Sequence, residues 1–138
     1  MKILIIDDET QQRSLTKSLL QTYFPDIIIV GEADSLQTGI KAVEQYLPDL
    51  LLLDIDLGDG TGFELLQKIK PITCQVIFIT AYNDQAIRAF KFSALDYLLK
   101  PLDPEELVYA IQKAQQHYSV NQQQTQLEVL FNQIQQGD

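Results

Sequence analysis

Short apolar runs alternate with segments of helical period along the chain. Five runs have strand length and predict strands near residues 2–7, 27–33, 49–54, 75–80 and 95–99. The segments between them carry apolar residues three or four positions apart, which is the period of an amphipathic helix. Strands that alternate with helices are typical of βα units around a parallel sheet. The pattern therefore predicts an α/β fold, a doubly wound five-stranded parallel sheet with helices on both faces.

The first two helical segments carry clear apolar stripes. Leu15, Leu19 and Tyr23 recur at four-residue steps in the first segment, so we expect them to cover a sheet face. In the second segment, four apolar residues share one stripe: Leu36, Ile40, Val43 and Leu47. The apolar run at residues 27–30 shows no polar alternation, which predicts a strand that is buried on both faces.

Turn and capping residues mark the boundaries between these elements. Pro48 ends the second helix, and three glycines indicate a flexible loop after the third strand: Gly58, Gly60 and Gly62. Asp103 is a good N-cap for the last helix, and Pro104 suits its first helical position. The apolar face of that helix should contain Leu107, Ile111, Ala114 and Tyr118.

The composition changes at the end of the last predicted helix. We expect residues 1–118 to form one domain, and residues 119–138 to form a Gln-rich tail or linker that is able to be helical. In the tail, four apolar residues recur at helical spacing: Leu127, Leu130, Phe131 and Ile134. Three roles remain open for this segment, namely an extension of the last helix, an association seam in a homodimer, and the start of a linker.

Charge and cysteine content exclude several classes of protein. Ten basic and nineteen acidic residues give a formal charge of −9, so the field of the chain should repel nucleic acid and anionic membranes. The single Cys74 excludes an internal disulfide. No apolar run approaches the roughly 20 residues that span a bilayer, and acidic residues 7–9 interrupt any signal peptide. We therefore expect a cytoplasmic protein that does not contact the membrane.

Polar side chains follow four of the predicted strands, at the point where each strand ends. They are Asp7 and Asp8, Asp54, Thr80 and Lys100. Ligands of open parallel sheets bind at the carboxyl ends of the strands, so these groups should meet at one edge. Each residue alone has an ordinary explanation, because Asp favours turns and helix N-caps, and Thr favours strands. Three carboxylates held together, however, require a counterion.

This arrangement predicts a site for a divalent cation and a phosphoryl group. Mg²⁺ binds carboxylate oxygens while retaining waters and phosphate oxygens as further ligands, and Mn²⁺ is an alternative. Asp54 is the best nucleophile, since a carboxylate can attack phosphorus to form an acyl phosphate. Lys100 would neutralise charge on the transferring oxygens, and the Thr80 hydroxyl would hydrogen-bond the product phosphate.

With these residues in place, residues 1–118 resemble a response-regulator receiver domain of bacterial two-component signalling. The resemblance is carried by four motifs: Asp7-Asp8, Leu53-Asp54-Ile55, Thr80-Ala81 and Lys100-Pro101. It implies a flavodoxin-like fold with receiver topology. It also implies that Asp54 is a phosphoacceptor that takes its phosphoryl group from a sensor histidine kinase in the presence of Mg²⁺.

The resemblance further implies roles for individual residues. The metal would be bound by Asp8 and Asp54, with support from Asp7 and the backbone carbonyl of Asp56. Phosphate contacts fall to Thr80 and Lys100, and the conformational switch to Thr80 and Tyr97. Residues 94–101 are similar to receivers that precede a LytTR-type DNA-binding domain. DNA would then be bound only through an output domain outside this chain, and residues 119–138 would be a linker in a transcription regulator.

One position departs from the receiver pattern, and two other functions are weighed against it. Receivers usually carry Met-Pro a few residues after the phosphoacceptor, whereas this chain has Leu57-Gly58, which leaves the loop conformation open. A calcium loop starting at Asp54 is excluded because its sixth residue is not Gly and its twelfth is not Glu. Asp54 and Asp56 also match the Asp-x-Asp motif of haloacid-dehalogenase-type phosphatases, and a binding module with a vestigial pocket is the other alternative.

Two residues beside the site and one histidine complete the set of candidates. Tyr82 and Asp56 each lie two residues after a site residue, so they either orient the water that hydrolyses the phosphate or are ordinary loop residues. His117 has no Cys or His partner nearby and should be a surface residue. The phosphohistidine donor is therefore expected to come from the kinase.

Overall fold

A computed structural model describes residues 1–136 and contains five strands and five helices. The strands are β1 (Lys2–Ile6), β2 (Ile28–Ala33), β3 (Leu50–Leu53), β4 (Gln75–Thr80) and β5 (Asp96–Leu99). The helices are α1 (Thr10–Tyr23), α2 (Leu36–Tyr46), α3 (Gly62–Lys68), α4 (Ala86–Lys91) and α5 (Pro104–Gln136). Strands and helices alternate strictly, as the apolar pattern predicts.

All five strands are parallel and form one sheet in the order β2-β1-β3-β4-β5. This confirms the predicted α/β fold with flavodoxin-like topology. The order reverses between β1 and β3, and the register pairs Ile6 at the end of β1 with Leu53 at the end of β3. Ligands of doubly wound sheets bind at such a reversal point, because the connections leave on opposite faces and the loops part there.

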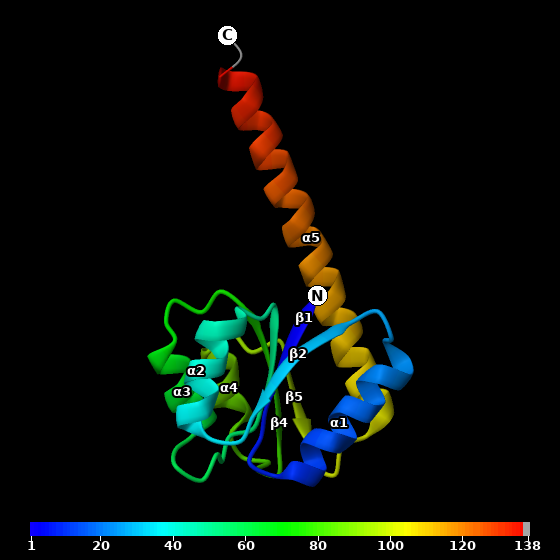
Figure 1. The fold of residues 1–138 in the computed structure, drawn as a ribbon, viewed down its shortest axis with the longest axis vertical. Helices are drawn as coiled ribbons and strands as arrows, with labels where there is room; N and C mark the ends of the chain where they lie inside the picture. Colours follow the sequence, from blue (N-terminus) through cyan, green and yellow to red (C-terminus); the bar gives the residue numbers. More distant parts are fainter. Residues whose placement is uncertain (137–138) are drawn as a thin grey trace.

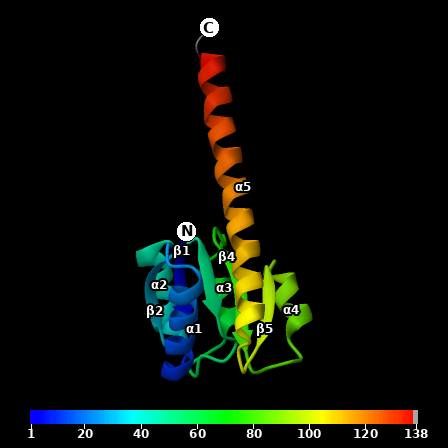
Figure 2. The ribbon, with the colours of Figure 1, turned by 90° about the vertical axis from the view of Figure 1, so that its right-hand side faces the viewer.

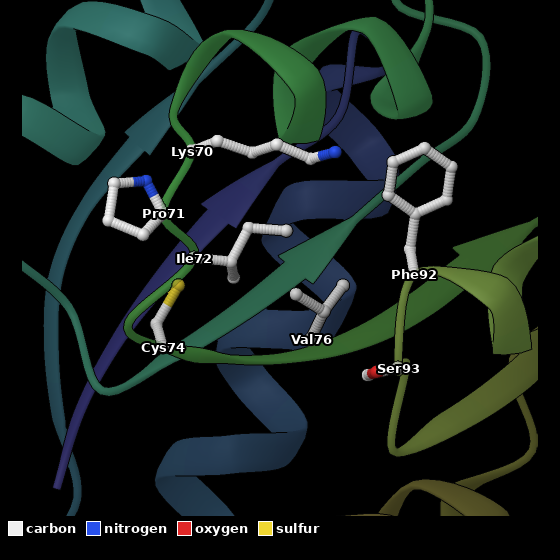
Figure 3. Close-up of a pocket in the computed structure, with 7 residues that line it drawn as sticks. All are labelled: Lys70, Pro71, Ile72, Cys74, Val76, Phe92 and Ser93. Carbon is white, nitrogen blue, oxygen red and sulfur yellow. The ribbon is translucent and has the colours of Figure 1, made fainter.

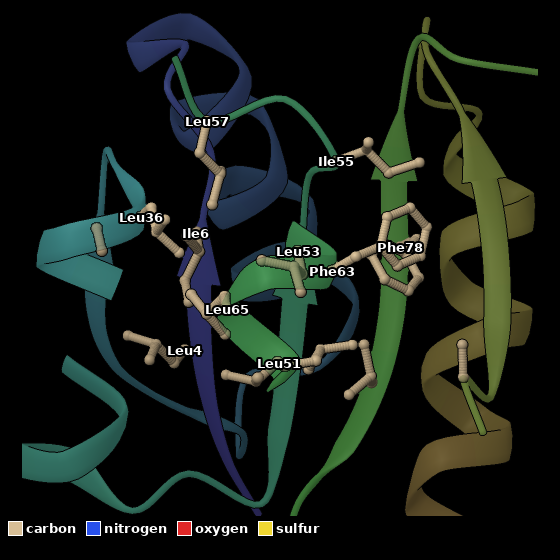
Figure 4. Packing of buried hydrophobic residues seen from close by; sticks show 14 of the residues in the cluster. Leu4, Ile6, Leu36, Leu51, Leu53, Ile55, Leu57, Phe63, Leu65 and Phe78 are labelled. Atoms are coloured by element: carbon tan, nitrogen blue, oxygen red, sulfur yellow. The ribbon is translucent and has the colours of Figure 1, made fainter. Parts of the chain in front are cut away.

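Helices cover both faces of the sheet (Figure 1, Figure 2). Successive side chains of a strand point to opposite faces, so Ile3 and Ile5 pack with α1 and α5, whereas Leu4 and Ile6 pack with α2 and α3. The core on the α2–α4 side is the larger one and includes Phe63 from α3 (Figure 4). β1, β3 and β4 are therefore enclosed on both sides.

Two predicted apolar faces are wrong in detail. In α1, Leu15 and Tyr23 are 43% and 52% exposed, and the buried residues are Thr16 and Leu20. Thr16 is tolerated inside because its hydroxyl donates a hydrogen bond to the Gln12 carbonyl, which leaves the methyl group to pack. Leu19, the middle residue of the predicted stripe, is partly buried and packs against the core, so the buried face of α1 includes Leu19 but lies about one position away from Leu15 and Tyr23.

The ends of α2 and β2 also differ from the predicted burial. Leu47 is exposed because it is the C-cap of α2 and adopts the left-handed conformation, with φ of 46°, which turns it away from the stripe. Ile28 is 59% exposed because β2 is an edge strand of the sheet. The prediction that residues 27–30 are buried on both faces is therefore wrong, although it describes β3 well.

The loop between β3 and α3 is anchored, in contrast to the flexible loop expected from its glycines. Leu57 is buried in the core, and the Asp59 carboxylate accepts hydrogen bonds from the backbone N–H groups of Leu36 and Gln37 at the start of α2. Gly58 has φ of 82°, which proline cannot adopt because its ring holds φ near −65°. The loop of this chain, which has Leu57-Gly58 in place of Met-Pro, therefore has a backbone conformation at Gly58 that a receiver with proline at this position cannot adopt.

Helix α5 begins where the capping residues predict and continues far beyond the sheet (Figure 1, Figure 2). The Asp103 carboxylate accepts a hydrogen bond from the Glu105 N–H, and Leu107, Ile111 and Ala114 are buried against the sheet. Of the three roles considered for the tail, the helical extension is therefore observed. No helix within residues 1–136 is both long and apolar enough to cross a membrane.

Candidate functional site

The carboxyl ends of β1 and β3 bring four acidic residues together. Asp7 and Asp8 directly follow β1, Glu9 precedes α1, and Asp54 directly follows β3. One carboxylate oxygen from each residue lies within 4.8 Å of the others. Asp7 and Asp54 are buried, whereas Asp8 and Glu9 face solvent. The three aspartates predicted to converge do so.

Lys100, at the end of β5, projects its amine into this group. Its Nζ lies 3.0 Å from Asp7 Oδ2, 2.9 Å from Asp54 Oδ2 and 2.8 Å from Glu9 Oε1. The remaining oxygens of the buried pair also accept hydrogen bonds, since Asp7 Oδ1 accepts one from the Glu9 N–H and Asp54 Oδ1 accepts one from the Ile55 N–H. We call the four acidic residues and Lys100 the acidic pocket.

The pocket retains an excess of negative charge. Burial raises the pKa of Asp7, an effect that the Glu9 N–H and Lys100 partly offset, and burial together with the charges of Asp54 and Asp56 raises the pKa of Asp8. Burial alone would lower the pKa of Lys100, but hydrogen bonds to Glu9, Asp54 and Asp7 outweigh it and raise that pKa. Lys100 therefore stays protonated, and a single amine faces four carboxylates.

These donors fit a hard divalent cation. The side-chain ligands offered are carboxylate oxygens, which are the ligands that Mg²⁺ and Mn²⁺ prefer. Within residues 1–136, Asp8 forms no ion pair, so its oxygens are available at the open side of the pocket. Burial, together with the neighbouring charges of Asp54 and Asp56, raises the pKa of Asp8, as is expected where carboxylates are packed together.

Asp56 and Tyr82 are exposed and lie close enough to the pocket for Asp56 to act on the pKa of Asp8 and for Asp54 to act on the pKa of Tyr82. The Asp56 carboxylate accepts a hydrogen bond from the Gly58 N–H at 3.0 Å and one from the Tyr82 hydroxyl at 3.4 Å. The charge of Asp56 raises the pKa of Tyr82, so that hydroxyl remains a donor at neutral pH. The backbone carbonyl of Asp56 as a metal ligand stays a prediction.

Thr80 and Tyr97 are linked through Tyr82. Thr80 lies at the end of β4 and is fully buried, and its Oγ1 accepts a hydrogen bond from the Tyr82 N–H at 3.4 Å. The Tyr97 hydroxyl donates a hydrogen bond to the Tyr82 carbonyl. The Tyr97 ring packs beside Phe78, with the ring centroids 6.2 Å apart. A displacement of Thr80 would therefore be transmitted to Tyr97 through one residue.

Two residues of the site were missed from the sequence. Glu9 could have been found as the third member of the acidic run at residues 7–9, although its contact with Lys100 is not visible in the sequence. Gly62 was read only as a loop residue. A Cβ atom at Gly62 would lie 2.5 Å from the Asp54 carbonyl oxygen and 3.0 Å from Leu53 Cγ, so glycine is what lets α3 start against the end of β3.

A separate apolar cavity lies near the start of β4, at the amino ends of the strands and so opposite the acidic pocket. It is lined by Lys70, Pro71, Ile72, Cys74, Val76, Phe92 and Ser93 (Figure 3). Burial raises the pKa of the Cys74 thiol to about 11, so the thiolate is scarce at neutral pH. His117 is exposed on α5, as predicted. None of these groups belongs to the acidic pocket.

Comparison with known proteins agrees with this geometry. The family model for the response regulator receiver domain matches residues 3–112. The chain is 37% identical over 130 residues to the sensory transduction protein LytT of Bacillus cereus, covering 93% of this chain and 50% of LytT. It is 38% identical over 120 residues to the transcriptional regulatory protein BtsR of Escherichia coli, covering 86% of this chain and 50% of BtsR.

A solved structure gives the same result for the fold. The response regulatory domain of protein mrkE from Klebsiella pneumoniae superimposes with a TM-score of 0.80 at 29% identity, covering 86% of this chain and 98% of that one. The present chain spans about half the length of the curated relatives it matches.

Proposed function

This chain belongs to the response-regulator receiver family, and we propose that Asp54 accepts a phosphoryl group from a sensor histidine kinase. A receiver is a signalling domain and not a classical enzyme. The observation that carries the proposal is the position of Asp54. Its carboxylate is almost fully buried at the reversal point of the sheet, grouped with three other carboxylates and 2.9 Å from the Lys100 amine.

The transfer would proceed by attack of an Asp54 carboxylate oxygen on phosphorus. The P–O bond to Asp54 forms as the P–N bond to the donor histidine breaks, and the histidine nitrogen keeps the electron pair and takes a proton from solvent. The Lys100 amine, which now contacts Asp54, would turn in part to an oxygen of the incoming phosphoryl group and neutralise its charge. The buried Thr80 hydroxyl would donate a hydrogen bond to the product phosphate.

A bound Mg²⁺ or Mn²⁺ would supply positive charge beside the phosphoryl oxygens. Asp7, Asp8 and Asp54 would hold it, with the backbone carbonyl of Asp56 as a further ligand. The support for this assignment is the oxygen-only donor set and the negative charge that Lys100 leaves uncompensated. Tyr82 and Asp56, which are joined by a hydrogen bond beside the pocket, would influence access of the water that hydrolyses the phosphate.

Phosphorylation would shift an existing conformational equilibrium through the path from Thr80 to Tyr97. If phosphate on Asp54 draws Thr80 inward, the Tyr82 backbone moves with it, and the hydrogen bond from Tyr97 to the Tyr82 carbonyl is strained or broken. The surface beside these residues exposes three large apolar side chains: Ile87, Phe90 and Tyr109. Its affinity for a partner or for a second copy would then change.

The output of the switch is proposed to be transcription. The chain's formal charge of −9 opposes direct contact with DNA, so DNA would be bound by an output domain outside this chain, of the LytTR type. The similarity to LytT and to the transcriptional regulatory protein BtsR supports this proposal. The cytoplasm, where a kinase and DNA are both accessible, is the proposed location.

The direct test is to incubate the protein with a small-molecule phosphodonor and Mg²⁺ and to measure intact mass. We expect one added phosphoryl group that Asp54→Ala abolishes. Asp84→Asn, which changes an exposed carboxylate outside the pocket, is the matched control and should label normally. Labelling that persists in Asp54→Ala would assign the nucleophile elsewhere. Absence of labelling in the unmodified chain would favour a binding module, and repeated hydrolysis of a phosphomonoester would favour a phosphatase.

A further inference from the structure

The last part of α5 exposes an unusual amount of apolar surface. Every side chain from Ser119 to Gln135 is exposed, and this segment, residues 119–136, is called the extension below. It projects away from the sheet as a single helix (Figure 1, Figure 2). Its large apolar residues are between 50% and 65% exposed: Val120, Leu127, Val129, Leu130, Phe131 and Ile134. A helical segment of this length gains little from propensity alone and normally depends on packing of an apolar face.

Five of these six residues form one stripe. Val120, Leu127 and Ile134 follow each other at steps of seven residues, which is the repeat of a left-handed coiled coil. Leu130 and Phe131 flank the line on either side, and Gln123 and Gln124 occupy the equivalent flanking positions one heptad earlier. Val129 lies on the opposite side of the helix. The stripe is therefore a seam with the width that one partner helix requires.

The seam faces away from the body of the domain. Leu127 follows Ile111 by sixteen residues, and at about 100° per residue this places it on roughly the opposite side of α5. Ile111 is buried against the sheet. Two copies of the chain can therefore bring their seams together while both sheets stay on the outside of the helix pair. The sheet of one copy does not obstruct the helix of the other.

Charge and residue order select the occupant of the seam. Glu128 is the only charged residue in the extension, so two extensions repel each other little although each whole chain carries −9. Four of the five seam residues lie in the C-terminal part of the extension, from Leu127 onward. In an antiparallel pair this apolar part would face the Gln-rich part of the partner. Among pairs that overlap along the whole extension, only a parallel pair in register brings apolar residues against apolar residues.

We propose that the extension binds a second copy of this chain in a parallel two-stranded coiled coil along Val120, Leu127 and Ile134. This arrangement places both receiver bodies at one end of the pair and the last described residue of each extension, Gln136, at the other. The inference rests on α5 alone and does not depend on phosphorylation of Asp54. It deepens the proposed function, because two outputs would be held side by side before any signal arrives.

The association state of the full unphosphorylated chain tests the proposal. In sedimentation equilibrium, the mass should rise with concentration from 15.7 kDa towards twice that value. Leu127→Asn removes one seam leucine from each copy and should weaken association by about a hundredfold or more. Val129→Asn is the matched control, since it makes the same kind of change on the opposite side of the same helix and should leave the mass unchanged. A monomer at all concentrations, or equal effects of the two variants, overturns the proposal.

Disulfide formation tests the direction of the pair. Ile134→Cys in a Cys74→Ser background should oxidise to a covalent dimer, because parallel chains in register bring the two copies of residue 134 together. Antiparallel chains would instead join Ile134→Cys to Val120→Cys or to Leu127→Cys in mixtures of two variants, according to how far the helices overlap, and either outcome overturns the parallel arrangement. Asp54 labelling of Leu127→Asn separates the two proposals, since a monomeric variant that still labels leaves the proposed function intact.

Discussion

The acidic pocket gathers charged groups where the protein is buried, whereas the extension of α5 exposes apolar groups where the protein is solvated. Asp54 is 5% exposed and Leu127 is 65% exposed, although a carboxylate favours water and a leucine side chain does not. Both arrangements raise the free energy of the isolated chain, the first through desolvation and repulsion and the second through hydration of apolar surface.

The difference shows which kind of component each region lacks. Excess negative charge is relieved by cations, so the pocket fits a divalent metal ion. The positive charge of that ion would in turn allow a phosphoryl group to approach. Excess apolar surface is relieved by another apolar surface, so the extension fits a second helix. The well-packed sheet between them supplies the stability that allows both to persist.

Replacing Lys100 should lower the stability of the protein more than any other change proposed here, because it increases the excess of negative charge in the pocket. Lys100→Met leaves Asp7 and Asp54 buried without their amine, and loss of one partner of a buried ion pair typically costs about 3–5 kcal/mol. We expect a loss of about that size in urea unfolding at pH 7 with chelator present. Excess Mg²⁺ should recover part of the loss, because a bound cation replaces the missing positive charge.

Lys113→Met provides the matched control for this prediction. Lys113 forms a similar contact with Asp96, with Nζ and Oδ2 2.8 Å apart, but both side chains are more exposed than those of Lys100, Asp7 and Asp54. An ion pair of this kind contributes only about 0–1 kcal/mol. If Lys100→Met and Lys113→Met reduced stability equally, the pocket would not be the charged, buried environment described above.

Gly62→Ala should have the next largest effect, because it changes the position of Asp54 without changing any charge. The added Cβ meets the Asp54 carbonyl oxygen at 2.5 Å, so the backbone must shift, and overpacking of this kind costs about 1–3 kcal/mol. We expect slower labelling of Asp54 as well as lower stability.

Gly58→Ala separates the effect of contact from the effect of backbone conformation. It has open space around the new Cβ but keeps a positive φ, which costs about 1–2 kcal/mol for an L-residue. Stability should therefore fall in both glycine variants, whereas labelling should slow only in Gly62→Ala. Slower labelling in Gly58→Ala would show that the loop, and not the Asp54 backbone, limits the reaction.

The sequence predicted the fold and most of the pocket for a physical reason. The alternation of apolar runs with helical segments reports burial directly, and the strand ends carry the polar groups that a parallel sheet brings to one edge. Asp7, Asp8, Asp54 and Lys100 could therefore be placed together from their positions alone, and the structure confirms that placement.

The errors arise where local pattern does not determine the environment. The exposure of Ile28 depends on which strand lies at the sheet edge, which the run of apolar residues does not encode. Leu15 and Tyr23 have the right spacing on the wrong side of α1, because Thr16 can bury its methyl group once its hydroxyl is bonded. Gly62 was missed because its role is a contact with Asp54, which lies eight residues earlier.

Asp8→Asn should change the free energy of unfolding by a smaller amount, and that amount should depend on pH. Burial in the folded state, with the charges of Asp54 and Asp56, raises the pKa of Asp8 above its ordinary value, so protonation of Asp8 favours the folded state. Its contribution to stability is fully present below the unfolded pKa and is lost as the pH rises through the folded pKa. Asp8→Asn avoids this loss, so without divalent metal the variant should be more stable than the unmodified chain at pH 7, by a few tenths of a kcal/mol.

Denaturation of both proteins between pH 4 and pH 7 checks this sign. The advantage of Asp8→Asn should shrink as the pH falls, and excess Mg²⁺ should reverse it by stabilising the unmodified chain more strongly. An advantage that does not change with pH would mean that Asp8 does not experience the repulsion of the pocket.

Truncation after Ser119 should have the smallest effect on the receiver itself. Among the removed side chains, those from Val120 to Gln135 are exposed, so in dilute solution the free energy of unfolding should change by less than about 0.5 kcal/mol, and Asp54 should still accept phosphate. At higher concentration the full chain gains stability from pairing by mass action, whereas the truncated chain does not. The difference in unfolding midpoint should therefore grow with concentration, and Val129→Asn should follow the full chain while Leu127→Asn follows the truncated one. A large difference that is already present in dilute solution would show that the extension supports its own receiver instead of a second copy.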